Sequence, residues 1–232
     1  SATHHLNRPA RAPDLPGFDE LILATGVRPR WPEIEAAPNT QVISYADLLS
    51  GQATAGRTVA VIGAGGIGFD VAEYLVAERP STTLRPADWR AEWGVGDPTC
   101  WPGGLMTPEP EKPARSVTMM QRKPERPGRT LGRTTGWIHR ASLAAYGVQM
   151  LRGVNYERIE PAGVRISFGQ SRESPRLVPA DTVVICAGQE SERGLLAELG
   201  DRPVHVIGGA DVAAELDAKR AIDQGTRLGA RL

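Results

Sequence analysis

The feature that most constrains the fold is a glycine-rich turn between a strand and a helix. An apolar run at residues 58–62 leads directly into Gly63-Ala64-Gly65-Gly66-Ile67-Gly68, and a helical pattern follows over residues 69–78. With the spacing G-x-G-x-x-G, Gly63 permits a tight turn, Gly65 leaves the backbone open to a large group, and Gly68 lets the helix pack closely on the strand. The sequence therefore predicts the strand, turn and helix of a parallel α/β sheet.

The same turn predicts a site for a diphosphate. Free N–H groups and the macrodipole favour negative charge at the start of a helix, which here begins at the turn. A glycine turn with a purely structural role is the alternative. The strand before the turn and the helix after it favour dinucleotide binding.

The end of the next strand indicates which dinucleotide is bound. A carboxylate there bonds the ribose of NAD, whereas basic residues accommodate the extra phosphate of NADP. After the strand at residues 117–121 the chain continues with Arg122 and Lys123 and has no acid at this point. These two side chains favour NADPH, with Arg129 and Arg133 as further candidates. An ordinary solvated basic turn is the alternative.

Further apolar runs complete the predicted sheet. Residues 20–26 and 181–188 share an acidic start, an apolar strand and a closing glycine, and residues 204–209 form one more strand. Both glycine-ended runs are expected to be buried on both faces. Short strands at 148–151, 156–160 and 164–168 are expected to form a meander.

Helices are predicted where start signals precede apolar residues. Ser44 with Asp47 resembles a capping box, so a short helix is expected to begin there and to end at Gly51. Further helices are predicted over about 137–146 and 216–228. Residues 79–116 form a long excursion whose tryptophans provide apolar surface, with a short helix around 88–93.

Composition excludes several classes of function. The chain has 27 basic and 27 acidic side chains, so no overall positive field attracts nucleic acid or an anionic membrane. No apolar run reaches the length of a membrane span and no signal peptide is evident, so we expect a cytoplasmic protein. Cys100 and Cys186 form no C-x-x-C pair and bind no cluster or zinc alone, and Cys186 is expected to be a buried, inert thiol. No residue is predicted to be catalytic or to bind a metal.

Several motifs together resemble one family of flavoproteins. They are Val61 to Asp70, Glu92-Trp93-Gly94, Gly103-Gly104-Leu105, Gln121-Arg122-Lys123, Thr134 to Arg140, Val183 to Glu190, and Glu215 to Ala218 continuing through Arg220 to Ile222. The sequence resembles the C-terminal part of bacterial NADPH-dependent 2,4-dienoyl-CoA reductases, which are old-yellow-enzyme-like flavoproteins related to trimethylamine dehydrogenase. The likeness extends from about Phe18 to the C-terminus.

The resemblance implies a chain of electron carriers. In the family an N-terminal barrel holds FMN and an iron–sulfur cluster and is followed by an FAD domain interrupted by an NADPH domain. Electrons pass from NADPH to FAD, through the cluster to FMN, and then to a dienoyl-CoA of fatty acid β-oxidation. The present sequence begins after the barrel and after the first glycine turn of the FAD domain, so both missing parts are expected partners and the FAD site is incomplete.

The resemblance also implies which residues belong to the flavin side. Ala24, Thr25 and Gly26 match the strand that leaves the FAD domain, and Ala187, Gly188 and Gln189 match the return. Gly209 and Asp211 match the segment at the ribityl chain, although Asp211 is equally suited to cap a helix. The helix around Leu216 and Ala218 is expected to direct N–H groups at the flavin.

The sequence thus predicts an α/β fold in which a Rossmann-like three-layer NAD(P)-binding domain is inserted in a partial FAD-binding domain of the disulfide-reductase type. The expected boundaries are 1–50 and 189–232 for the FAD remnants and 51–188 for the NADPH domain. The predicted function is hydride delivery from NADPH to FAD, in a chain that is by itself inactive. A non-catalytic nucleotide-binding or structural module is the alternative, and a thioredoxin-reductase-like enzyme is disfavoured by the missing C-x-x-C pair.

Overall fold

The computed structural model describes residues 3–77, 81–214 and 218–232. The chain divides into two compact units. One unit consists of residues 31–188, and the other combines residues up to Arg30 with residues 189–232. We call them the central unit and the terminal unit.

The central unit is built on a sheet of five parallel strands in the order β3-β10-β4-β5-β6. The strands are β3 (Val42–Ser44), β10 (Thr182–Ile185), β4 (Thr58–Ile62), β5 (Ser116–Gln121) and β6 (Gln149–Arg152). The two strands that come next in the sequence after β4, which are β5 and β6, lie on one side of it in the sheet. The later strand β10 lies on its other side. The strand order therefore reverses beside β4, and ligands of open α/β sheets bind at such a reversal.

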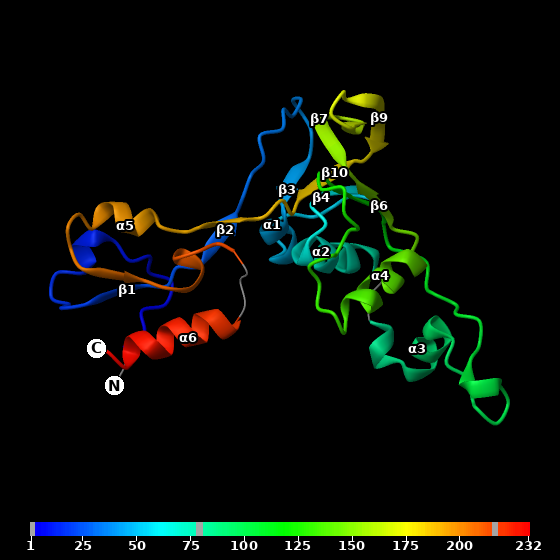
Figure 1. The fold of residues 1–232 in the computed structure, drawn as a ribbon, viewed down its shortest axis with the longest axis horizontal. Coiled ribbons are helices and arrows are strands. Elements are labelled where there is room, and N and C mark those ends of the chain that lie inside the picture. Colours follow the sequence, from blue (N-terminus) through cyan, green and yellow to red (C-terminus); the bar gives the residue numbers. More distant parts are fainter. Residues whose placement is uncertain (1–2, 78–80, 215–217) are drawn as a thin grey trace. The chain divides into compact units, whose positions relative to one another are not determined.

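Helices and a second sheet cover the two faces of this sheet, which gives three layers (Figure 1). One face carries α1 (Tyr45–Leu49), α2 (Gly66–Val76) and α4 (Gly136–Ala145), and the other carries an antiparallel meander of β7 (Val154–Glu160), β8 (Gly163–Phe168) and β9 (Glu173–Pro179). Side chains alternate accordingly along β4. Val59 and Val61 pack with the helices, whereas Ala60 and Ile62 pack with the meander.

Burial along α2 explains why this segment is helical and how it docks. Phe69, Ala72 and Val76 are fully buried at spacings of three and four residues, with Leu75 beside them. Burying each large apolar side chain contributes about 1.5–3 kcal/mol. The capping expectation for α1 is confirmed as well, because the Ser44 hydroxyl accepts a bond of 3.1 Å from the Asp47 amide.

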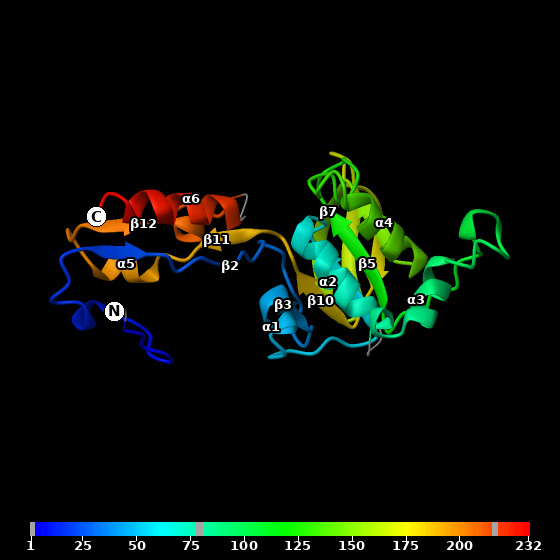
Figure 2. The same cartoon turned by 90° about the horizontal axis from the view of Figure 1, so that it is seen from below.

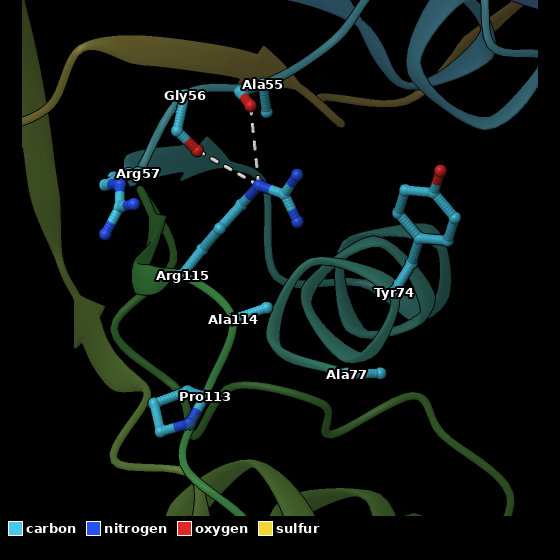
Figure 3. A pocket seen from close by; sticks show the side chains of 8 residues that line it. All are labelled: Ala55, Gly56, Arg57, Tyr74, Ala77, Pro113, Ala114 and Arg115. Atoms are coloured by element: carbon cyan, nitrogen blue, oxygen red, sulfur yellow. Dashed lines mark hydrogen bonds between the residues drawn. The ribbon is translucent and has the colours of Figure 1, made fainter. Parts of the chain in front are cut away.

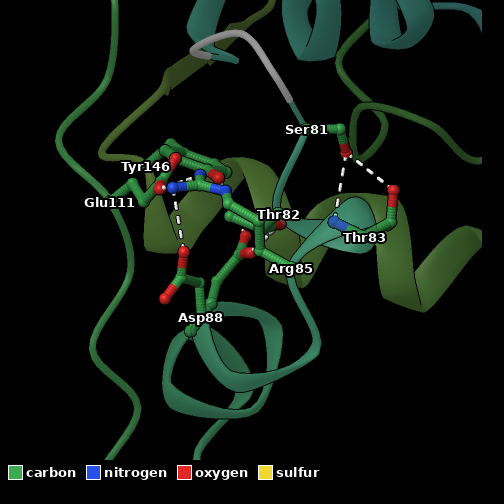
Figure 4. Close-up of polar contacts among 8 residues, drawn as sticks. Ser81, Thr82, Thr83, Arg85, Asp88, Glu111 and Tyr146 are labelled. Carbon is green, nitrogen blue, oxygen red and sulfur yellow. Dashed lines mark hydrogen bonds and ion pairs between the residues drawn. The ribbon is translucent and has the colours of Figure 1, made fainter.

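The described residues 81–115 of the long tryptophan-bearing excursion belong to the central unit and make several polar contacts. They contain η2 (Thr82–Leu84), α3 (Pro86–Trp93) and η3 (Pro102–Gly104), so the expected short helix is confirmed. Arg85 pairs with both Asp88 and Glu111 at 2.8 Å, as Figure 4 shows. Glu92 accepts bonds from Thr82 and from the Tyr146 hydroxyl.

The terminal unit contains two small sheets. Strand β1 (Leu21–Leu23) pairs in parallel with β12 (Val204–Val206), and β2 (Val27–Pro29) pairs antiparallel with β11 (Gln189–Ser191). Helices α5 (Gly194–Glu198) and α6 (Ala218–Gly229) lie on opposite sides of β1 and β12 in Figures 1 and 2. The single-turn elements η1 (Ala12–Asp14) and η4 (Gly208–Ala210) complete this unit.

The first division between the two units falls after Arg30, whereas the domain boundary expected from the sequence is 50/51, and the pairing of β3 with β10 puts β3 in the central unit. Two expectations about strands were wrong. The segment predicted as the first meander strand is β6 of the parallel sheet, and the third meander strand is β9. Strand β1 is not buried on both faces, since Ile22 is 49% exposed.

Candidate functional site

The glycine turn connects β4 to α2, and the surroundings of its glycines match the roles expected of them. Gly63 has φ +118°, and a Cβ there would lie 2.2 Å from the Cys186 carbonyl oxygen. A Cβ on Gly68 would lie 2.1 Å from the Gly63 carbonyl oxygen, whereas a Cβ on Gly65 would meet nothing within 4 Å. Gly63 and Gly68 are therefore required for close packing, and Gly65 leaves the outer side of the turn open.

The carboxyl ends of three strands meet at this turn. The Gly63 amide donates to the Met120 carbonyl at the end of β5, and the Cys186 amide donates to the Ile62 carbonyl, both at 2.8 Å. Ala187 follows directly, with its nitrogen 3.2 Å from where a Gly63 Cβ would stand, and Gly188 continues at φ +104°. The structure thus brings the predicted residues Ala187 and Gly188 beside the turn, at the reversal of strand order.

The amino terminus of α2 is suited to an anion. Gly65 is the N-cap, and no side chain in the described part of the chain caps the helix. A Cβ on Gly66 also meets nothing within 4 Å, so the space beside Gly65 and Gly66, which lie between Ala64 and Ile67 in the sequence, is open. The eleven-residue helix places the positive end of its dipole there.

The predicted basic residues follow β5 on a backbone that is held from several sides. The Gln121 amide group donates to the carbonyls of Lys123 and Glu125, and the Lys123 carbonyl also accepts from the Gly153 amide. Arg122 and Lys123 extend from this braced turn with exposed side chains. Arg129 and Arg133 are exposed on the loop that follows.

The Tyr156 phenol lies near enough to Arg122 to interact with its charge. The Tyr156 hydroxyl donates to the Met120 carbonyl at 2.8 Å. Burial raises the pKa of this phenol, and the nearby Arg122 charge opposes that rise. Arg122 therefore lies at the end of β5. Side chains at this position would contact the ribose of an adenosine bound at the turn.

Of the residues expected on the flavin side, Ala187 and Gly188 belong to the central unit, whereas Thr25, Gly26 and Gly209 lie together in the terminal unit. The Thr25 hydroxyl donates to the Glu192 carbonyl, and the Glu192 amide donates to the Gly26 carbonyl at 3.0 Å. A Cβ on Gly209 would lie 3.1 Å from the Gly26 carbonyl carbon, and the Ser191 hydroxyl donates to the Gly209 carbonyl. Ala24 precedes this cluster, and Gln189 pairs with Pro29 in the β11–β2 ladder.

Asp211 has a partner that the sequence did not indicate. Its carboxylate accepts a bond of 2.8 Å from the Gln224 side chain on α6, and the Gln224 carbonyl oxygen accepts one of 2.6 Å from the Gly208 amide. No local pattern marks Gln224, because the two groups that it joins lie 13 and 16 residues away. Ala218 begins α6, and Leu216 lies outside the described residues.

Four other side chains that could carry chemistry have structural surroundings. Burial raises the pKa of the Cys186 thiol to about 12, so it stays protonated and unreactive at neutral pH. His139 contacts Glu73 on α2, and His205 contacts Glu20, each at 2.8 Å. Trp137 is 60% exposed and so does not fill the core.

Neither a metal site nor a membrane-spanning helix occurs among the described residues. No three His, Cys, Asp or Glu side chains in the ranges 3–77, 81–214 and 218–232 are grouped so that they could hold a metal ion. No helix within the same ranges is both long enough and apolar enough to cross a membrane.

A cavity of about 640 Å³ opens at the opposite, amino-terminal edge of the sheet, and Figure 3 shows its lining. The Arg115 guanidinium there donates to the carbonyls of Gly56 and Leu75, and Ala77 at the end of α2 lies alongside. The carbonyl end of a helix disfavours anions, and Arg115 is already bonded to backbone. The glycine turn therefore remains the better candidate for binding an anionic cofactor.

The chain belongs to the pyridine nucleotide-disulphide oxidoreductase family, whose model matches residues 16–216. This match agrees with the parallel sheet, the glycine turn and the three layers.

Three proteins show the range of relatives. A metal reductase of Desulforamulus reducens is 27% identical over 190 residues, which are 78% of this chain and 26% of that protein. The structure of 2-naphthoyl-CoA reductase with 2-naphthoyl-CoA has a TM-score of 0.68 at 22% identity, over 92% of this chain and 27% of its own. The structure of histamine dehydrogenase from Rhizobium sp. 4-9 has a TM-score of 0.70 at 18% identity. The match covers 97% of this chain and 32% of the dehydrogenase chain. This chain spans about a quarter to a third of their lengths.

Proposed function

We propose that this chain binds NADPH and positions it to reduce FAD, as the nucleotide-binding and flavin-reducing portion of a 2,4-dienoyl-CoA-reductase-like oxidoreductase. The observation that carries the proposal is the glycine turn. Gly63 and Gly68 have no room for a Cβ, Gly65 faces open space, and the helix behind them has no side-chain cap. This combination fits a pyrophosphate held by backbone amides.

The choice of NADPH over NADH rests on the end of β5. Arg122 and Lys123 supply two positive charges where NAD-binding relatives of this fold place a carboxylate. The Arg122 guanidinium would hold the phosphate on the adenosine ribose by paired hydrogen bonds, and the Lys123 ammonium would add a point charge. When bound, the cofactor supplies hydride chemistry, and the protein supplies position and electrostatics.

The flavin side of the proposal rests on the cluster in the terminal unit. Thr25, Gly26 and Gly209 bring three backbone segments together, and the Asp211 carboxylate, oriented by Gln224, is assigned to the ribityl chain. A helix-capping role for Asp211 has less support, because this carboxylate accepts from a side chain in the described residues. FMN, an iron–sulfur cluster and the barrel that holds them are assigned to a further part of the enzyme, which acts in the cytoplasm on acyl-CoA substrates of β-oxidation.

Calorimetric titration with NADPH and with NADH tests the proposal on the full chain. Replacing both cations (Arg122→Ala with Lys123→Ala) should weaken NADPH binding by about 10- to 100-fold, the value of one or two charged hydrogen bonds, and leave NADH binding nearly unchanged. Arg158→Ala, an exposed arginine on the meander paired with Glu35, is the matched control and should alter neither affinity. Equal affinity of the unsubstituted chain for both nucleotides would refute the NADPH assignment.

The second candidate is a nucleotide-binding module without hydride chemistry. The two candidates differ when FAD is added. If the first candidate is right, NADPH lowers the absorbance of added FAD only when the missing half of the flavin site is restored. On the second, no addition produces flavin reduction although the nucleotide still binds. Steady NADPH oxidation by the 232-residue chain alone would contradict the expectation that it is inactive.

A further inference from the structure

The loop between β5 and α4 is fixed to the glycine turn at one residue. Gly128 donates its amide to the Ala64 carbonyl at 3.1 Å, so the loop and the turn are directly bonded. Gly128 is buried and has φ +71°, and a Cβ there would lie 2.8 Å from Cζ of Phe69 and 2.7 Å from Cδ1 of Leu131. A glycine is needed here because the loop presses onto the first turn of α2.

Arg140 holds the other side of this anchor. From α4, its Nη1 donates to the Gly128 carbonyl at 3.2 Å. The three groups form a relay in which Arg140 holds Gly128 and Gly128 holds Ala64 of the glycine turn. The guanidinium therefore acts on the turn through the loop, and its contacts do not require a bound nucleotide.

The position of Arg140 carries an energetic cost. Its Nε is buried and has no hydrogen-bond partner in the described part of the chain. A buried donor without a partner costs about 1–3 kcal/mol. A methionine of similar length would fill the same space without this penalty, so the guanidinium has a role beyond packing.

The loop that Arg140 anchors carries exposed cations on both sides of Gly128. Arg126 precedes it, and Arg129 and Arg133 follow. Together with Arg122 and Lys123, they place five cations on the segment that follows β5, which also carries Glu125. Because the loop meets the turn at Gly128, the hold on this residue determines how closely these charges approach a ligand bound at the turn.

We infer that Arg140 is a positioning residue for selectivity between NADPH and NADH, through the relay from Arg140 to Gly128 and Ala64. The inference rests on the proposed function and deepens it. Loss of the guanidinium frees the loop, so the added phosphate of NADPH meets a mobile set of cations rather than a fixed one. The diphosphate site itself, formed by the amides of α2, is retained.

The test compares Arg140→Met with Arg115→Met in the full chain. Arg115 also bonds backbone carbonyls, but at the opposite edge of the same sheet, so it controls for a general loss of stability. Arg140→Met should weaken NADPH binding by about tenfold and NADH binding by less than about threefold, as expected when charged hydrogen bonds to one phosphate are lost. Arg115→Met should leave the ratio of the two affinities unchanged.

A second measurement needs no nucleotide. Trypsin cuts after arginine, and Arg129 and Arg133 lie on the anchored loop, so their cleavage rates in the unliganded chain report how firmly the loop is held. Arg140→Met should accelerate cleavage at these two sites by about tenfold, and Arg115→Met should not. Gly128→Ala disturbs the same anchor by steric conflict. It should therefore reproduce both the weaker NADPH binding and the faster cleavage of the loop.

The outcomes separate the two proposals. Failure of the unsubstituted chain to bind either nucleotide overturns the proposed function. Normal binding by that chain, with Arg140→Met weakening both nucleotides equally or leaving loop cleavage unchanged, overturns the inference about Arg140.

Discussion

The central and terminal units differ in what holds them together. In the central unit, two buried clusters lie on the two faces of a five-stranded sheet. Among the described residues, the buried apolar side chains of the terminal unit are Leu23, Leu199 and Ala210. Its strands pair two at a time, and isolated two-stranded ribbons are at best marginally stable.

This difference separates two ways of making a site. The glycine turn is built on strands that the core already fixes, so its geometry is set by packing. The cluster of Thr25, Gly26 and Gly209 depends on backbone pairing and side-chain bonds with little core beneath. We therefore expect a preorganised dinucleotide site and a flavin side that is ordered further by its ligand.

Hydrogen exchange on the full chain should show the largest difference between the central and terminal units. Amides of β4, β5 and β10 exchange only through global opening, whereas those of β1 and β12 exchange through local opening of the terminal unit. We expect protection factors at least about 1,000-fold higher in the central strands, which corresponds to about 4 kcal/mol. Mass spectrometry of peptides covering these strands measures the ratio, and equal protection would show that the two units unfold together.

Paired glycine substitutions should show a smaller contrast. Gly63→Ala forces a Cβ to within 2.2 Å of the Cys186 carbonyl in a fixed sheet, whereas Gly26→Ala meets open space, and both glycines have positive φ. We expect Gly63→Ala to destabilise the chain by about 3 kcal/mol or more, and Gly26→Ala by about 1 kcal/mol. Chemical denaturation of both variants checks this order, and a smaller loss for Gly63→Ala would mean that the turn can shift.

The glycine turn and its strand could be predicted because their signals are local. β4 has the predicted limits, and the turn and the start of α2 lie together in the sequence. The short helix at Tyr45–Leu49 was predicted for the same reason, since its cap lies within four residues.

Long-range pairing accounts for the failures. β6 looks like a meander strand by its own sequence, and only its register with β5 assigns it to the parallel sheet. β9 was missed because its residues up to Arg176 are exposed and include no large apolar side chain, so the strand shows no alternation of apolar and polar residues. Arg140 and Gln224 were missed as site residues because their partners are set by tertiary contact, 12 or more residues away.

Tyr156 should produce the smallest effect, which is confined to the central unit and varies with pH only in the alkaline range. Burial raises the pKa of its phenol in the folded chain above the ordinary value of about 10. At a pH between the ordinary pKa and the raised one, the unfolded chain loses a proton that the folded chain keeps. The resulting stability is fully present below pH 10 and is lost as pH rises toward the folded-state pKa.

Tyr156→Phe should therefore flatten the alkaline decline, although Tyr146, whose pKa is also raised, retains part of it. At neutral pH the variant should lose about 1 kcal/mol, because the hydroxyl no longer donates to the Met120 carbonyl. Urea unfolding at pH 7 and at pH 10.5, followed by exchange in β5 and β12, measures both effects. A change in β12 equal to that in β5 would contradict the independence of the two units, since Tyr156 lies wholly within the central one.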